Sequence, residues 1–341
     1  MPTPFERIPS VDTADELVET AFSRAASTSE NKSGVDSQRA MVSTASNSLN
    51  SSLSRTVEGF PSFENLDGFY NAVARAATDV DEVRQALSRV DWASGKVVDV
   101  ADEAQSEMAN SDSQHAIEVR KRAFARMSSV VERVDDALLT LDDARSALVG
   151  VPEVGDHPTV VLAGYPNVGK SSLLRRVTRA KPEVAEYPFT TKGVELGHFE
   201  DPEYHTTYQM VDTPGLLDRP EDERNSMEEQ AVEAFEHLAD VTVFVIDPSE
   251  TCGYSLEDQV ELRDEFEERF GGGEGDDGSS RFVTVANKTD LNYDLPDGTH
   301  AEFDFRVSVL EDDCVEELVE AVTDRLRSFR GFDAPSHRRE G

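Results

Sequence analysis

Apolar residues recur at helical spacing through the first 150 residues, where alternating, strand-like patterns are almost absent. This spacing predicts helices that each bury one face. The Ser-rich section 23–54 keeps the spacing and has few Gly or Pro residues, so we expect a packed helix there and not a disordered linker. Turns are predicted at Glu58–Pro61 and Asp91–Gly95, and a long helix over about His115–Leu148. Several helices with short connections predict an α-helical bundle as the N-terminal domain, residues 1–155.

The pattern changes after residue 155, where strands alternate with helices. Buried parallel strands are expected at Val160–Ala163, Val241–Asp247 and Arg281–Ala286, and a hairpin over 196–199 and 204–211. Helices are expected at about 227–238, 256–270 and 315–329. The alternation predicts a doubly wound, mostly parallel α/β domain over residues 156–330, with ligands beyond the carboxyl ends of the strands. A short tail, 331–341, follows; the acidic Gly-rich loop 271–280 is given no role.

The composition is strongly acidic, with a formal net charge of −36 and seven Lys among the 33 basic residues. Such a composition is similar to that of proteins from organisms that accumulate salt, because concentrated salt screens the repulsion. An acidic protein of ordinary origin is the alternative. The N-terminus shows no signal-peptide pattern, and no apolar run reaches membrane-spanning length. We therefore expect a cytoplasmic protein with no membrane partner.

A Gly-rich loop, GYPNVGKS, follows the first predicted parallel strand and precedes a helix. It fits the G-x-x-x-x-G-K-[ST] phosphate loop, in which backbone N–H groups and a helix N-terminus surround an anion. A chance glycine turn is the alternative. In a phosphate loop Lys170 would reach the outer phosphates and the Ser171 hydroxyl would bind Mg²⁺. The nucleotide-binding residues expected here are Gly164, Asn167, Val168, Gly169, Lys170, Ser171 and Ser172.

Two further motifs follow predicted strands in the order that a GTPase requires. The first is D-x-x-G, in which Asp212 would lie beside Mg²⁺ and the Gly215 N–H beside the γ-phosphate. The second is N-K-x-D, formed by Asn287, Lys288 and Asp290. One carboxylate can accept hydrogen bonds from both N–H groups on the edge of guanine, which adenine lacks. The backbone N–H of Ser308 is expected to contact the guanine oxygen.

Together these motifs resemble the Obg–HflX-like superfamily of GTPases, through GYPNVGKSSLL, YPFTT, DTPGLL and NKTD. The helical segments FPSFENLDGFY and RKRAFARMSSVVERV are similar to the Nog (nucleolar G protein) family in archaeal form. The resemblance implies an assembly factor of the large ribosomal subunit or its precursor, with the helical domain on ribosomal RNA. It also implies that Thr191, with Thr190 less favoured, contacts Mg²⁺ and the γ-phosphate. Lys170, Thr191 and Gly215 are thus the catalytic candidates.

The residue after the D-x-x-G glycine predicts slow hydrolysis of GTP to GDP. Ras-like enzymes place there a Gln that orients the attacking water, whereas this chain has Leu216. An apolar side chain cannot orient water, so we expect a weak catalyst that needs a partner. A monomer is favoured. A regulatory switch that recognises only protein partners is the alternative function.

One predicted helix concentrates basic residues: Arg120, Lys121, Arg122, Arg126 and Arg133. Three of them, Arg122, Arg126 and Arg133, lie opposite the apolar face and would form a stripe that binds RNA. The alternative is a solvated face whose arginines pair with Glu118 or Glu132 of the same helix. Local Arg residues suffice for phosphate contacts, so a negative net charge does not exclude RNA.

The resemblance also generates a prediction of potassium dependence. Asn167 occupies the loop position that, in this superfamily, helps coordinate a monovalent cation near the β- and γ-phosphates. A solvent-facing Asn in a turn is the alternative. Hydrolysis in KCl should be faster than in NaCl at matched ionic strength by about tenfold, because K⁺ would stabilise developing charge. Equal rates, or a full potassium response in Asn167→Ala, would contradict it.

Overall fold

The structure is a computed structural model, and it describes residues 3–28, 33–151, 157–178, 182–185, 187, 193–201, 206–221, 224–271, 280–291 and 302–330. These residues fall into two compact units, one of which is helical and one of which contains a sheet. None of the described helices combines the length and the apolar composition that a membrane span needs.

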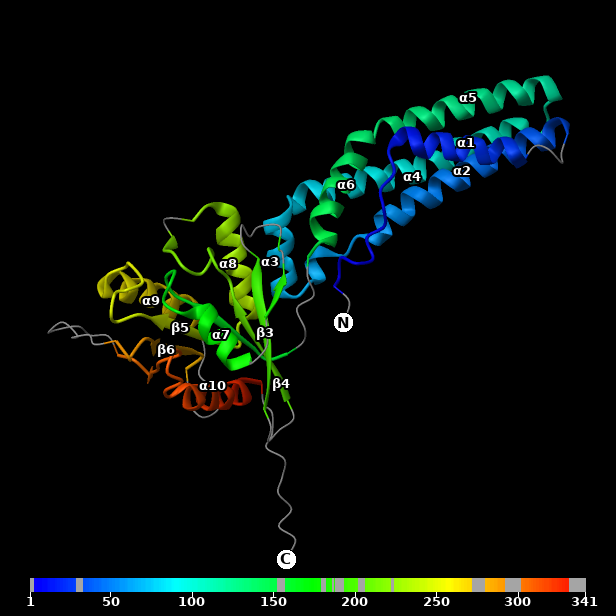
Figure 1. The fold of residues 1–341 in the computed structure, drawn as a ribbon. Helices are drawn as coiled ribbons and strands as arrows, with labels where there is room; N and C mark the ends of the chain where they lie inside the picture. Colours follow the sequence, from blue (N-terminus) through cyan, green and yellow to red (C-terminus); the bar gives the residue numbers. More distant parts are fainter. Residues whose placement is uncertain are drawn as a thin grey trace, which may run out of the picture. The chain divides into compact units, whose positions relative to one another are not determined.

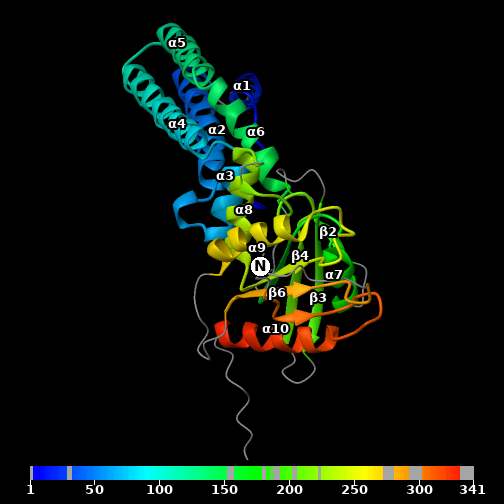
Figure 2. The same ribbon diagram turned by 90° about the vertical axis from the view of Figure 1, so that its left-hand side faces the viewer.

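The helical unit contains Pro2–Leu66 and Ala77–Gly150. Its long helices run side by side in both views (Figures 1 and 2). They are α1 (Ala14–Thr28), α2 (Gly34–Gly59), α4 (Val80–Met108), α5 (Ser113–Glu132) and α6 (Asp135–Val149). A short 3₁₀ helix, η2, covers Phe63–Asn65. The fully buried side chains include Leu49, Leu53, Met108, Met127, Leu138, Leu141 and Leu148, so the predicted apolar faces form a common core.

Helix α4 continues through Asp91–Gly95, where a turn was predicted, and the prediction is wrong. Val90, Ala93 and Val97 are fully buried on one face, so the apolar spacing is unbroken. Gly95 lies in open space, where a glycine in a helix costs only about 1 kcal/mol. Packing of this long face outweighs that small cost.

The predicted helix over His115–Leu148 is two helices, because the chain breaks between α5 and α6 at Arg133 and Val134. The guanidinium of Arg89 in α4 donates to the Arg133 carbonyl at 3.0 Å and pairs with the Asp136 carboxylate. It thus satisfies a carbonyl that the break leaves outside the helical ladder. Asp135 accepts the Ala14 N–H of α1 at 2.9 Å. Tertiary contacts, which apolar spacing does not encode, hold this break in place.

Helix α3 (Gly68–Ala77) belongs to the other unit, although the predicted boundary at residue 155 placed it with the bundle. Phe69 lies edge-on to Phe235 and to Tyr187 of that unit, each with ring centroids 6.3 Å apart. Gly68 lies so close to His237 that a Cβ atom would come within 2.7 Å of the imidazole. The chain therefore enters the second unit once before residue 150.

Within the described residues the sheet has seven strands, in the order β2-β3-β4-β1-β5-β6-β7. They are β1 (Thr159–Ala163), β2 (Glu183–Ala185), β3 (Val194–Asp201), β4 (Thr206–Asp212), β5 (Val241–Ile246), β6 (Phe282–Ala286) and β7 (Phe305–Arg306). Strand β3 is antiparallel to β2 and β4, and all other neighbours are parallel. Strands β1, β5 and β6 are buried throughout, as their continuous apolar runs predict.

Helices cover both faces of the sheet (Figure 2). Among the described residues, the helices that flank it are α7 (Lys170–Thr178), α8 (Ser226–Leu238), α9 (Leu256–Phe270) and α10 (Val315–Arg330). Val243 of β5 lines a small apolar cavity with side chains of α7 and α10. The next residue, Phe244, contacts Phe266 of α9 on the opposite face. The predicted doubly wound, mostly parallel domain is confirmed.

The bundle core generates a stability prediction. Leu49 of α2 is fully buried, so Leu49→Ala should lower the free energy of unfolding by about 2–5 kcal/mol through lost burial and a cavity. Leu139→Ala in α6 is the matched control, because that side chain is 51% exposed. Its effect should stay within about 0.5 kcal/mol. Urea unfolding measures both, and equal losses would contradict the assigned core.

Candidate nucleotide site

The predicted nucleotide motifs meet at one edge of the sheet. Strands β1, β4, β5 and β6 are mutually parallel neighbours, so their carboxyl ends lie together. The phosphate loop follows β1, D-x-x-G begins at the last residue of β4, and N-K-x-D follows β6. This is the edge at which open α/β sheets bind ligands.

Two glycines of the phosphate loop are required by close contacts. Gly164 has φ +125°, and a Cβ atom there would lie 2.3 Å from the Val245 carbonyl oxygen. Gly169 has φ +111°, and its Cβ would lie 2.2 Å from the side-chain nitrogen of Asn287. Any larger residue would push the loop away from β5 or from the guanine motif.

The Lys170 ammonium is buried inside this loop. It donates to the carbonyl oxygens of Gly164 at 2.5 Å and Tyr165 at 2.9 Å. Burial lowers the pKa of Lys170, although the charges of Asp212 and Asp218 oppose the shift. A buried ammonium bonded to two neutral carbonyl oxygens suits a phosphate, which would supply a negative charge.

Asp212 and Ser171 form the predicted magnesium pair. The Ser171 hydroxyl donates to one carboxylate oxygen of Asp212 at 2.5 Å. The other oxygen, Oδ1, is buried and has no hydrogen-bond partner among the described residues. Burial raises the pKa of Asp212, and Lys170 and Ser171 oppose this shift. An unpartnered carboxylate oxygen next to a hydroxyl fits a hard cation that takes oxygen ligands.

The guanine motif is tied to the phosphate loop through Asn287. Its amide donates to the Val168 carbonyl at 2.9 Å and accepts the Val309 N–H at 3.2 Å. The Ser308 hydroxyl donates to the Asp290 carboxylate at 2.6 Å, which orients that carboxylate. The Ser308 N–H, predicted to contact guanine, instead donates to the Asp313 carbonyl at 3.2 Å. In this arrangement the side chain of Ser308, and not its N–H, contacts the N-K-x-D motif.

Asp218 is a residue that the sequence analysis missed. Its carboxylate accepts the Gly215 N–H at 2.8 Å, and that N–H is the predicted γ-phosphate donor. The Asp218 side chain is 11% exposed. The neighbouring Arg219 donates to the Gly215 carbonyl at 2.7 Å. The only signal in the sequence is an acidic residue three positions after the D-x-x-G glycine.

The remaining predicted residues are placed less tightly or lie outside the described ranges. Asn167 is exposed with φ 64°, and Ser172 is exposed at the start of α7. This agrees with either interpretation of Asn167. Thr190 and Thr191 lie outside the described residues, as do 272–279 of the acidic loop.

The basic stripe lies in the helical unit, where two of its three arginines are paired. Arg122 contacts Glu107 at 2.6 Å, and Arg126 contacts Glu103 at 2.7 Å. These acids belong to α4, so the pairs join two helices and differ from the intrahelical pairs considered above. Arg133 is exposed, and the described residues give it no ion pair. The stripe is therefore partly neutralised.

Both units match known families. Residues 5–155 match the NOG1 N-terminal helical domain, and residues 159–288 match a family described as 50S ribosome-binding GTPase. Over 298 residues the chain is 33% identical to an uncharacterized protein of Methanocaldococcus jannaschii, covering 84% of this chain and 81% of that protein. Over 252 residues it is 34% identical to nucleolar GTP-binding protein 1 of Encephalitozoon cuniculi, covering 73% and 46%.

A solved structure titled as a nucleolar GTP-binding protein 1 from Plasmodium falciparum is 30% identical, with a TM-score of 0.43. It covers 53% of this chain and 92% of the solved chain. The chain spans less than half of the length of seven curated relatives named as nucleolar GTP-binding proteins.

The contact of Asp218 generates a prediction about triphosphate binding. A γ-phosphate that takes the Gly215 N–H must displace a carboxylate and approach its charge. Asp218→Asn should therefore raise affinity for a non-hydrolysable GTP analogue by roughly tenfold and change GDP affinity much less. Calorimetric titration measures both. The control, Glu221→Gln, removes an exposed charge from the same loop; a similar gain there would contradict the prediction.

Proposed function

We propose a function for this chain from the premise that it belongs to the nucleolar G protein (Nog) family of GTPases. In our proposal it binds guanine nucleotides selectively, hydrolyses GTP slowly and acts in assembly of the large ribosomal subunit. The observation that carries the nucleotide part is the convergence of the phosphate loop and N-K-x-D through the Asn287–Val168 hydrogen bond. Through this bond the proposed phosphate site and the proposed purine site lie next to each other at one edge of the sheet.

Each residue of the site has a proposed task. Lys170 and the loop N–H groups bind the phosphates, and Asp290, oriented by Ser308, reads the guanine edge. Ser171 and Asp212 would hold Mg²⁺, which when bound neutralises phosphate charge. The Gly215 N–H would donate to the γ-phosphate once Asp218 has moved. Lys170 and Gly215 stabilise charge that develops during hydrolysis.

Slow hydrolysis is supported by the surroundings of Leu216. This side chain is 3% exposed, so it packs into the protein and cannot orient an attacking water. A binding partner that supplies or moves a group able to orient this water would raise the rate.

A role on the ribosome is supported by the match to a 50S ribosome-binding GTPase family and by relatives named as nucleolar. We place the RNA contact on the stripe Arg122, Arg126 and Arg133. RNA phosphates would have to compete with Glu107 for Arg122 and with Glu103 for Arg126. Release of counterions from the RNA would favour the phosphate contacts. The same pairs favour the second candidate, a switch that binds only protein, since a satisfied arginine needs no RNA.

Guanine selectivity is tested by titrating labelled GTP, GDP and ATP in concentrated salt. Guanine nucleotides should bind at least about 100-fold more tightly than ATP, because adenine leaves Asp290 unpaired. Asp290→Asn should remove most of this preference. The control Glu311→Gln, an exposed acid near the same loop, should keep it. Comparable ATP affinity in the wild type would contradict the nucleotide part of the proposal.

The ribosomal role is tested by sedimentation with large-subunit particles at native salt. Changing the three stripe arginines to Gln should lower the bound fraction at least about tenfold and leave GTP binding intact. Gln is chosen because Glu would face Glu103 and Glu107 and destabilise the bundle. Arg24, Arg55 and Arg84 changed to Gln form the control with the same charge change in the same unit. An equal loss of particle binding in the stripe variant and in the control variant would exclude specific RNA binding by the stripe. A wild type that never sediments with particles favours the protein-only switch.

A further inference from the structure

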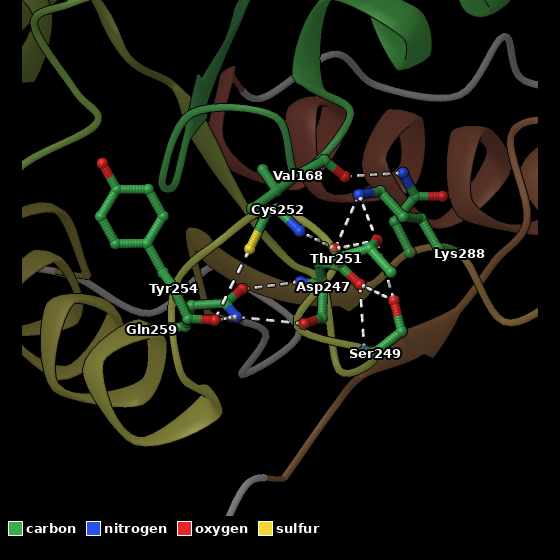
Figure 3. Close-up of polar contacts among 9 residues, drawn as sticks. Val168, Asp247, Ser249, Thr251, Cys252, Tyr254, Gln259 and Lys288 are labelled. Atoms are coloured by element: carbon green, nitrogen blue, oxygen red, sulfur yellow. Dashed lines mark hydrogen bonds and ion pairs between the residues drawn. The ribbon is translucent and has the colours of Figure 1, made fainter. Parts of the chain in front are cut away.

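A buried carboxylate outside the recognised motifs, Asp247, lies next to the predicted base site. It follows β5 directly and is fully buried. One oxygen accepts the Ser249 N–H at 3.0 Å and hydroxyl at 2.5 Å. The other accepts the Thr251 hydroxyl and the Cys252 N–H, each at 2.8 Å (Figure 3). Both oxygens thus accept hydrogen bonds from the loop that follows the strand.

The same carboxylate also holds the lysine of N-K-x-D. The Lys288 ammonium donates to Asp247 Oδ2 at 2.6 Å and to the Thr251 hydroxyl at 3.0 Å. The register of β5 and β6 pairs Ile246 with Ala286, so the residues that follow these strands lie side by side. Burial alone would raise the pKa of Asp247, but hydrogen bonds from Lys288, Ser249 and Thr251 hold it below its ordinary value. The Asp247 carboxylate is therefore ionised where it meets the Lys288 side chain.

The loop from Asp247 to Tyr254 also reaches the phosphate loop. The ring of Tyr254 stacks on Tyr165 with centroids 4.0 Å apart. Gln259 of α9 braces the loop, accepting the Asp247 N–H at 2.8 Å and donating to the Asp247 carbonyl at 3.0 Å. It also donates to the Tyr254 carbonyl at 3.1 Å. One braced loop thus contacts both the phosphate loop and the lysine of the guanine motif.

We propose that Asp247 is a positioning residue for the purine base: it fixes the Lys288 ammonium so that the methylene stem lies ready along the base face. Restricting a flexible lysine before binding removes an entropy cost that each binding event would otherwise carry. The stem contacts the ring and not its guanine-specific edge. Asp247 therefore sets how long any purine stays, and Asp290 sets which purine is preferred. This inference rests on the proposed guanine-nucleotide function.

The release rate of fluorescent GDP from the full chain tests the proposal. Asp247→Asn keeps the size of the side chain and removes its charge, so release should be about tenfold faster. Lys288→Met keeps an apolar stem without the ammonium. If Asp247 acts through Lys288, adding Asp247→Asn to Lys288→Met should change release by less than about twofold. Two independent, multiplying effects would overturn the proposal.

Two further variants separate positioning from loop stability. Ser249→Ala removes the hydroxyl bond to the oxygen that does not contact Lys288, and with it a 3.1 Å contact with the Thr251 hydroxyl. Both bonds from Lys288 remain, so the change should destabilise the loop and alter GDP release less than Thr251→Val does. Thr251→Val removes the second partner of the ammonium at an exposed position, and it remains usable if Asp247→Asn does not fold. It should speed release by roughly threefold. Equal effects of Ser249→Ala and Thr251→Val would overturn the proposal.

Comparing the affinities for GDP and IDP separates a failure of the proposed guanine-nucleotide function from a failure of the inference about Asp247. IDP lacks the exocyclic amino group, so Asp290→Asn should reduce the ratio of GDP to IDP affinity. Asp247→Asn should weaken both nucleotides by the same factor and keep the ratio, and a changed ratio would overturn the proposal. A wild type that binds ADP as tightly as GDP overturns the proposed function and this inference together. If the wild type prefers GDP over ADP but the effects of Asp247→Asn and Lys288→Met on GDP release multiply, only the inference about Asp247 is overturned.

Discussion

The side-chain amide of Asn287 holds the site together. It bonds at once to the phosphate loop, through the Val168 carbonyl, and to the segment after β7, through the Val309 N–H. Gly169 has no side chain because this amide occupies the space where one would be. Asn287 is 3% exposed, so loss of either bond would leave a buried polar group unsatisfied, which costs about 1–3 kcal/mol. One side chain thereby joins the phosphate loop, the N-K-x-D motif and the segment after β7.

Much of the sheet unit could be predicted from sequence because its strands carry continuous apolar runs and its motifs follow strand ends. Helix α9 has the predicted bounds, Leu256–Phe270, and β5 and β6 differ from prediction by one residue each. Their burial on both faces leaves little freedom for alternative patterns. The phosphate loop and N-K-x-D were recognisable because their chemistry demands particular residues at fixed spacing.

Features fixed by distant contacts could not be predicted. The break at Val134 depends on Arg89, which is more than forty positions earlier in the chain. The continuity of α4 through Gly95 depends on burial of Val90, Ala93 and Val97 in the bundle, which outweighs the local turn signal. Asp247 was recognised as the end of a strand, but its partners come from a loop with no motif and from Lys288. No sequence motif marks Asp218 either, because only the structure shows that its carboxylate accepts the Gly215 N–H.

The membership of α3 has a consequence for dividing the chain. Because Asp67–Ala76 belongs to the unit that contains the sheet, the described chain crosses between the units near residues 66, 76 and 150. A fragment that starts at residue 156 would carry every nucleotide motif yet lack the helix whose Phe69 covers Phe235 and Tyr187. The border between the two matched families, at residues 155 and 159, is therefore not a border between independently folding pieces. If either unit were expressed as one continuous segment, α3 would be separated from Phe235 and Tyr187, and their apolar surfaces would be exposed to water.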